Sequence, residues 1–510
     1  MVGTHSTEEN VSMKRRKGQN GQSVPVKKTA AKKAAAKKPA PRKASARVRK
    51  APVVKAPVKK TVAKPKKAAV KAPVPMDTEP AVPKEPLVPK EPSVPKEPSM
   101  PTPTPFLKSR TAAVHSLPQR ATASGTVFVF GNGDCGQLGL GEDMLERKKP
   151  FPVPAIKDQA IVDVASGGLH TMALDADGHL WSWGCNDQKT LGRDGDEFAA
   201  ARVQGLDNTR IVRVACSDSA TFALAEDGHV YAWGTFRSAE GIMGFSESVL
   251  VQGRPEVINA FREPIVDLCA GVDHALALSV SGKVYAWGYG QQGQLGRLVM
   301  ERRRLHGLTP ERLRLHDVQQ IGCGSYHSFA VTRDGSVYAW GLNNFHQLGL
   351  RANEGGAEEI VHEPTVVSGL KDARIVKISG GEHHSIALSA DGTLYAFGRS
   401  DSHQTGLPFS TLSSDAPAGD DASSHKKAIT APTQIKDLES ITDIVCGSNH
   451  NLALAANGKA YSWGYGEMLQ LGNGEEEDVE LPTVLTGQKI EGKNVLKVAA
   501  GGQHSAILAA

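Results

Sequence analysis

Histidine and carboxylate side chains recur at regular places along this chain, and these residue types move protons in enzymes. Each of six histidines follows a run of small residues, in segments such as IVDVASGGLH and IVKISGGEHH. These histidines are His170, His274, His327, His384, His450 and His504. A side chain kept in six copies of one pattern suits a scaffold better than a single reaction. We therefore expect most of them to hydrogen-bond the backbone.

No pattern typical of covalent catalysis accompanies the histidines. The sequence has no nucleophile paired with a base and no metal-ligand spacing, and the glycines of GNGDCG lack the strand-to-helix context of a nucleotide-binding fingerprint. The cysteines form no CxxC pair, and Cys216, Cys269, Cys323 and Cys446 occupy nearly equivalent strand positions. We interpret these four as small buried hydrophobic residues in a reducing compartment. The sequence thus predicts no enzyme of the covalent kind, no metal and no cofactor.

The elements that must position these side chains repeat about every fifty residues. Aromatic and β-branched runs such as VYAWG end in a glycine seven times, at Gly131, Gly184, Gly234, Gly288, Gly341, Gly398 and Gly464. In four cases the loop that follows closes on Gln-Leu-Gly. A dipeptide such as Asp177-Gly178 precedes each later run and predicts a hairpin in which both turn residues have positive φ. Each repeat therefore holds about four strands, the content of one propeller blade.

The two ends of the repeat region complement each other. The segment GGQHSAILAA is not followed by another glycine-ended strand, whereas residues 126–130 supply such a strand at the other end. We predict an all-β fold, a seven-bladed β-propeller closed by pairing of its N- and C-terminal strands, which leaves only short sheet edges. The propeller domain is predicted over residues 121–510, after a tail of different composition.

Residues 1–120 form a Lys-, Ala- and Pro-rich tail that we predict to be disordered. They hold 28 of the 60 Lys and Arg residues but only 7 of the 54 Asp and Glu residues. Such a tail neutralises nucleic-acid phosphates without reading bases, so we expect it to bind DNA. Lys14, Arg15, Arg16 and Lys17 read as a nuclear import signal. No apolar stretch is long enough to span a membrane, and we expect no membrane partner.

Counting strand alternations separates two faces of the predicted ring. The Gly-x-His turns and the loops after the glycine-ended strands share one face, and the Asp-Gly turns share the other. On the first face one repeat breaks the pattern, because Ala220 replaces the histidine and Asp218 lies just before it. Asp218 and Asp273 predict an acidic binding surface, and Asp134 and His346 lie in loops of the same face.

Three segments depart from the repeat. Residues 235–245, TFRSAEGIMGF, replace the Gln-Leu-Gly loop and predict a protruding hairpin whose apolar tip, Ile242 and Met243, contacts a partner. Residues 297–316 are strongly basic, and their path predicts that they reach the opposite face. Residues 407–428 read as a flexible surface loop without chemistry.

Over residues 125–510, motifs such as GNGDCGQLGLGEDMLERKKP, WGTFRSAEGIMGF and GLNNFHQLG resemble the regulator of chromosome condensation family, exchange factors for the small GTPase Ran. The resemblance implies a β-wedge that pushes on the phosphate-binding loop of the GTPase, formed here by Thr235, Phe236, Arg237, Gly241, Ile242 and Met243. It implies exchange roles for Asp134, His170, Asp218, Asp273, His346 and His504. It also implies that Arg302, Arg303 and Arg304 anchor in the acidic patch of the histones.

The resemblance predicts a guanine-nucleotide exchange factor for Ran that acts while bound to chromatin. This role would support nucleocytoplasmic transport and the assembly of the mitotic spindle and nuclear envelope. Ran, the nucleosome, DNA and importins are the expected partners, in the nucleus and on mitotic chromosomes. A chromatin-binding propeller without exchange activity is the main alternative. An ultraviolet-B receptor of the same fold would need tryptophans clustered on one surface, whereas five of the six here precede a strand-ending glycine.

Overall fold

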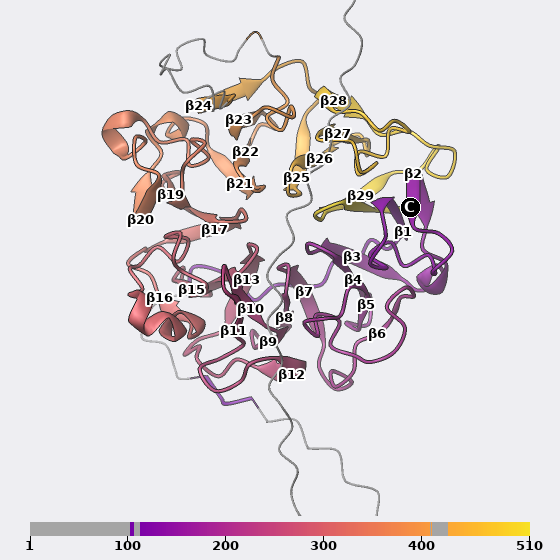
Figure 1. Cartoon of the computed structure of the whole chain (residues 1–510), viewed down its shortest axis with the longest axis horizontal. Helices are drawn as coiled ribbons and strands as arrows, with labels where there is room; N and C mark the ends of the chain where they lie inside the picture. The colour runs from indigo at the N-terminus through magenta and orange to yellow at the C-terminus, as the bar shows by residue number, and fades with distance from the viewer. Residues whose placement is uncertain (1–102, 107–112, 409, 411–426) are drawn as a thin grey trace, which may run out of the picture. The chain divides into compact units, whose positions relative to one another are not determined.

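Seven four-stranded antiparallel sheets stand around a ring (Figure 1), which confirms the predicted seven-bladed propeller. The computed structural model describes residues 103–106, 113–408, 410 and 427–510. The import signal, the rest of the tail up to residue 102, and most of the 407–428 loop lie outside this range. Among the described residues, no helix is both long and apolar enough to cross a membrane.

In the descriptions that follow, the strands of each sheet are given from the centre of the ring outward. The sheet that contains both ends of the propeller is built from β29 (Val495–Ala500), β30 (His504–Ala509), β1 (Thr126–Asn132) and β2 (Glu146–Pro152). The next three sheets are β3 (Ile161–Ser166), β4 (His170–Asp175), β5 (Leu180–Gly184) and β6 (Ala201–Arg202); β7 (Ile211–Cys216), β8 (Ala220–Ala225), β9 (Val230–Gly234) and β12 (Gln252–Val257); β13 (Ile265–Ala270), β14 (His274–Ser279), β15 (Val284–Gly288) and β16 (Glu311–Arg312).

The remaining sheets repeat this order. They are β17 (Val318–Cys323), β18 (His327–Thr332), β19 (Val337–Leu342) and β20 (Ile360–Val366); β21 (Ile375–Gly380), β22 (His384–Ser389), β23 (Leu394–Arg399) and β24 (Ala428–Ile435); β25 (Ile441–Cys446), β26 (His450–Ala455), β27 (Ala460–Gly464) and β28 (Val479–Val484). A separate two-stranded hairpin is formed by β10 (Phe236–Ser238) and β11 (Gly241–Gly244). Short 3-10 helices, η1 (Pro154–Ile156), η2 (Glu301–Leu308), η3 (Ala352–Glu354) and η4 (Ser368–Leu370), lie in the connections.

The ring closes through the pair of strands that the sequence predicts. β1 runs antiparallel to β30 from Thr126, opposite Ala509, to Gly131, opposite His504. The second strand of each of the other six sheets is buried along its whole length, because neighbouring sheets cover both of its faces. The third to fifth residues of these strands are apolar, and the core consists of clusters between adjacent sheets.

The Asp-Gly turns differ from the prediction in one respect. Only the glycine has a positive φ, for example 92° at Gly178, while Asp177 does not. The Gly178 amide bonds the Asp175 carbonyl at 3.1 Å, and the Asp175 amide bonds the His179 carbonyl at 3.0 Å. This is a three-residue loop with a glycine bulge, in which one left-handed residue is sufficient.

The Gln-Leu-Gly loops each hydrogen-bond to the following sheet. The carbonyl oxygen of Gln137 accepts the indole N–H of Trp183 at 3.0 Å and the hydroxyl of Thr171 at 3.0 Å, both from the following sheet. The carbonyl of Gln294 accepts the indole N–H of Trp340 in the same way, and that of Gln404, in the corresponding Gln-Thr-Gly loop, accepts the indole N–H of Trp463. The tryptophans thus serve hydrogen bonding between sheets as well as core packing.

The chain before β1 crosses the face of the Asp-Gly turns. The ring of Phe106 stacks on His229 with centroids 4.2 Å apart, and the amides of Val114 and His115 both donate to the carbonyl of Val280. Farther along, the Arg120 guanidinium donates to the carbonyl of Ala176, and Gly125 N donates to Ile161 O at 2.9 Å. The described segments from residue 103 onward are therefore bound to several sheets in succession.

Candidate functional site

The six recurring histidines form a belt that joins neighbouring sheets. In each, Nε2 lies 2.8–2.9 Å from a hydroxyl or amide oxygen one residue beyond the histidine position of the next sheet. The pairs are His170–Thr221, His274–Ser328, His327–Ser385, His384–Asn451, His450–Ser505 and His504–Thr171. The partner is thus a side chain of the next sheet, whereas the sequence predicts the backbone.

Hydrogen-bond direction fixes the tautomer of these histidines. The Ser328 hydroxyl donates to the Gln294 carbonyl, so its oxygen accepts Nε2–H of His274. Burial lowers the pKa of His170 to about 4 and the pKa of His504 to about 3, which keeps both rings neutral at physiological pH. Both side chains are 0 % exposed. Both side chains therefore lie inside the ring in this structure, and their exchange roles stay a prediction.

The belt is interrupted at one junction, between β8 and β14. Ala220 replaces the histidine there, and Ala275 replaces the residue that would accept its hydrogen bond. Both alanines belong to the cluster that encloses Phe236, which is 1 % exposed. The rings of Phe222 and Phe236 have centroids 6.0 Å apart. The missing hydrogen bond thus makes room for the aromatic residue at the base of the extra hairpin.

The hairpin of β10 and β11 is anchored at its base and exposed towards its turn. Phe236 and Met243 are buried, whereas Ile242 is 46 % exposed. The turn itself is small and polar, with Ala239 and Glu240 exposed. The predicted hairpin is present, but its apolar tip is wrong in part, because Met243 serves as an anchor and Ile242 alone of the two faces outward.

Asp273 joins the hairpin to the centre of the ring. Its Oδ1 accepts the backbone N–H of Arg237 at 2.7 Å. Loss of hydration raises the pKa of Asp273 to about 6, although Arg237 partly offsets this effect. The carboxylate therefore fixes the angle of the hairpin and places negative charge beside it.

Asp218 lies nearby at the mouth of a central cavity of about 310 Å³. Its side chain keeps contact with solvent, but the surrounding turns remove part of its hydration. This loss, together with the charges of Asp273 and Glu382, raises the pKa of Asp218 to about 7. A basic partner group placed among these carboxylates would favour their charged forms.

Sequence reasoning missed Glu382 as a member of this acidic group. Glu382 occupies the same turn position as Asp218, two residues before the histidine position. The turn amides link the sheets here, since Asp218 N donates to Val272 O at 3.2 Å and Glu382 N to Ser448 O at 2.8 Å. Aligning this turn position across all repeats would have identified Glu382.

Asp134 and His346 lie in loops on the same face, as expected. Asp134 is exposed, and its amide donates to the Asn132 side chain at 3.1 Å. His346 is partly exposed and has a φ of 62°, a left-handed conformation that lets its loop close. Both residues remain candidates for partner contact.

The arginine-rich insertion lies beside the hairpin, which corrects its expected position on the opposite face. Helix η2 packs against β11 and β15, and Leu308 at its end is buried in the cluster around Phe236. Arg304 forms an ion pair of 2.7 Å with Glu240 of the hairpin turn, while Arg302 and Arg303 are exposed. Only the later part of the insertion crosses the edge of the ring, where β16 pairs with β15.

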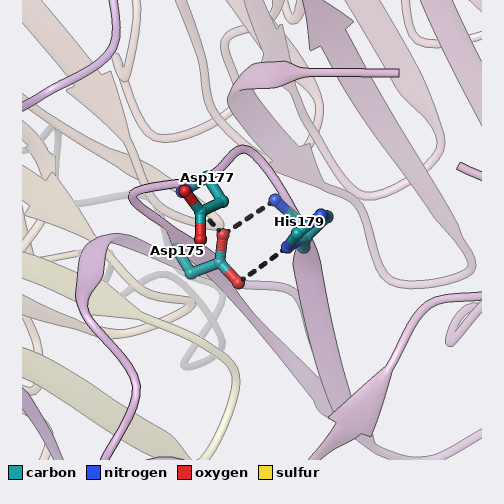
Figure 2. A group of neighbouring side chains, drawn as sticks. All are labelled: Asp175, Asp177 and His179. Atoms are coloured by element: carbon teal, nitrogen blue, oxygen red, sulfur yellow. Dashed lines mark hydrogen bonds and ion pairs between the residues drawn. The ribbon is translucent and has the colours of Figure 1, made fainter. Parts of the chain in front are cut away.

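A group of metal-ligand residue types lies in the turn after β4, but its side chains close the turn. Asp175 Oδ1 accepts the amides of Asp177 and His179 at 3.0 and 2.9 Å (Figure 2). Its Oδ2 lies 3.2 Å from both His179 Nδ1 and Trp181 Nε1. The carboxylate most able to hold a metal is thus engaged in hydrogen bonds within the hairpin.

Comparison with known proteins agrees with this geometry. The model of the RCC1-like domain matches residues 126–507. The chain belongs to the regulator of chromosome condensation family. The Xenopus laevis Regulator of chromosome condensation is 36 % identical over 422 residues, which cover 79 % of this chain and 93 % of that protein. Guanine nucleotide exchange factor SRM1 of Saccharomyces cerevisiae is 38 % identical over 418 residues, with coverage of 74 % and 86 %.

Solved structures of this family also match. The crystal structure of Prp20p from Saccharomyces cerevisiae, described with its binding properties to Gsp1p and histones, has a TM-score of 0.72 at 38 % identity and covers 77 % of this chain and 93 % of its own. Yeast RCC1 (Prp20) bound to Kap60 has a TM-score of 0.72 at 36 % identity, with coverage of 83 % and 96 %. The propeller that carries the buried tryptophans and the hairpin of β10 and β11 therefore has the fold of the regulator of chromosome condensation family.

Proposed function

We propose that this protein is a guanine-nucleotide exchange factor for the small GTPase Ran. The observation that carries the proposal is the hairpin of β10 and β11, whose Phe236 fills the interrupted junction of the histidine belt. Asp273 holds this hairpin by a hydrogen bond, close to Asp218 at the central cavity. The relative named as an exchange factor and the relative described with Gsp1p support it.

The mechanism needs no covalent step. The hairpin presents Ile242 to the phosphate-binding region of the GTPase, and Asp218 and Asp273 pair with a basic GTPase residue that otherwise holds phosphate. Such contacts favour the nucleotide-free state, so nucleotide leaves faster and any nucleotide that rebinds releases the factor. The factor accelerates exchange without choosing between GDP and GTP.

Nucleotide release tests this proposal directly. Ran loaded with a fluorescent GDP analogue is mixed with catalytic amounts of the full chain, and the loss of fluorescence is followed. We expect strong acceleration by the native protein and a large loss in Asp273→Ala. Asp391→Ala, in a turn of the opposite face, is the matched control. Absence of acceleration would favour a chromatin-binding propeller without exchange activity.

We further propose that the protein works on chromatin. The exposed Arg302 and Arg303 are suited to the acidic patch of the histones, whereas Arg304 is paired with Glu240. The basic tail would add DNA contacts that weaken with salt, and its Lys14–Lys17 segment would bind importins. The relatives described with histones and with Kap60 support this reading. It implies nuclear residence and, in mitosis, association with chromosomes.

Nucleosome binding separates these contributions. Replacing both Arg302 and Arg303 with Ala is expected to weaken binding to nucleosomes, whereas Arg210→Ala, an exposed arginine near the opposite face, is not. Because the two arginines lie beside the wedge, exchange is measured with and without nucleosomes. Unchanged nucleosome affinity in the double variant would contradict the assignment.

A further inference from the structure

Two thiols meet between adjacent sheets at the centre of the ring. Cys269 Sγ, on β13, lies 2.8 Å from Cys323 Sγ, on β17. A disulfide bond has an S–S distance of about 2.05 Å, so less than 1 Å separates this contact from bonding distance. Neither thiol is part of the wedge or of the acidic group at the cavity mouth.

The register of the inner strands explains this contact. Cys269 is the fifth residue of its strand and Cys323 is the sixth of the next inner strand. The same relation recurs between β21 and β25, where Cys446 Sγ, at the sixth position, lies 3.3 Å from the carbonyl of Ser379, at the fifth. Cys216 is also a sixth residue, but the fifth residue of the preceding inner strand is Ala165. The fold thus brings two cysteines together where both positions carry one.

The surroundings of the pair allow oxidation. Both cysteines line the central cavity of about 310 Å³, which is wide enough for a small oxidant. Burial raises the pKa of Cys323, whereas a hydrogen bond from the neighbouring Cys269 thiol lowers it. A thiol with a lowered pKa forms the reactive thiolate more readily.

We propose that Cys269 and Cys323 form an oxidation site, at which a peroxide converts the two thiols into a disulfide that links β13 to β17. The Cys323 thiolate attacks a peroxide oxygen, so that an S–O bond forms, the O–O bond breaks and the released hydroxide takes a proton to become water. The Cys269 sulfur then attacks the sulfenic sulfur, and the S–O bond breaks to release a second water. The two thiols lose two electrons, and hydrogen peroxide gains them.

This bond would lie just below the wedge. Cys269 is four residues before Asp273, which accepts the hydrogen bond of the hairpin. The crosslink joins residues 54 positions apart, and closing such a loop restricts the unfolded chain. We expect the oxidised protein to melt about 5 °C higher than the reduced protein.

Peptide mapping tests the proposal. The full chain is treated with hydrogen peroxide, free thiols are blocked with iodoacetamide, and a digest made without reductant is analysed by mass spectrometry. We expect crosslinked peptides that contain Cys269 and Cys323 and that separate in dithiothreitol, while Cys216 and Cys446 are alkylated. The crosslink and the rise in melting temperature should disappear in Cys269→Ala and persist in Cys216→Ala.

Equal melting temperatures of the reduced variants establish that both remain folded. The proposal is overturned if peroxide oxidises Cys135 and Cys185 without linking Cys269 to Cys323. It is also overturned if Cys269→Ala keeps the oxidation-dependent rise in melting temperature.

Discussion

Removal of the Phe236 ring should disable exchange without unfolding the propeller. Phe236 is 1 % exposed and packs within the cluster that contains Ala220 and Ala275. Replacing a buried phenylalanine with alanine costs about 3–5 kcal/mol. The hairpin of β10 and β11 has only three paired positions, and an isolated hairpin is marginally stable in water. The hairpin should therefore leave its site far more often, although Met243 and the hydrogen bond from Arg237 N–H to Asp273 remain.

The expected effect on activity follows from this free energy. At about 1.4 kcal/mol for each factor of ten, the equilibrium constant for docking of the hairpin falls at least about 100-fold in Phe236→Ala. Release of the fluorescent GDP analogue from Ran should slow by up to this factor. Hydrogen exchange at residues 235–245 should accelerate, whereas the melting temperature of the ring should fall by less than about 2 °C.

Phe329→Ala is the matched control. Phe329 is 0 % exposed and lies on β18, in another sheet, where it packs edge-on against Phe397. This variant should lower the melting temperature by about 5 °C or more and keep normal exchange per folded molecule. If Phe236→Ala lost stability as Phe329→Ala does and kept its exchange activity, the wedge would not be the working element.

Three further predictions concern the ring. Partial loss of hydration raises the pKa of Asp218 in the folded protein to about 7, so folding becomes less favourable as pH rises from about 4 to 7. The Asp218→Asn variant should therefore show a smaller decline and a higher melting temperature at pH 8, which thermal melts at several pH values would measure. Ser385→Ala removes the partner of His327 Nε2 and should cost about 1–3 kcal/mol in denaturant titrations, with exchange unchanged. Deleting residues 1–102 should weaken DNA binding and its salt dependence without changing the melting temperature, whereas deleting residues 1–124 should also lower it, because the contacts across the Asp-Gly face are lost.

The repeat itself made most of the fold predictable. Local residue patterns indicate the alternating strands, the tight turns and the N-terminal strand that completes the last sheet. The pairing of Thr126 with Ala509 follows from them. The belt of histidines was harder to predict, because its hydrogen bonds cross to the next sheet. A pattern within one repeat identifies His327 but not the Ser385 hydroxyl that it meets.

The functional face was predictable where the pattern breaks. The repeat pattern identifies Ala220 as a break, but the physical reason for the break requires the position of Phe236, which only packing reveals. The predicted path of the arginine-rich insertion is wrong, because strand directions determine where a loop starts and ends but not its course between these points. The buried Leu308 side chain and the Arg304–Glu240 ion pair hold this loop against the hairpin of β10 and β11.

The segment that crosses the Asp-Gly face has a mechanical consequence. A pull on the chain upstream of residue 103 would first load the Phe106 stack, then the Val114 and His115 amides, and then Arg120. Only after these anchors yield in series would tension reach Thr126 and begin to peel β1 from β30. In a protein tethered through its tail, the applied force would thus break these surface contacts first. The pairing of β1 with β30, which closes the ring, would be the last to break.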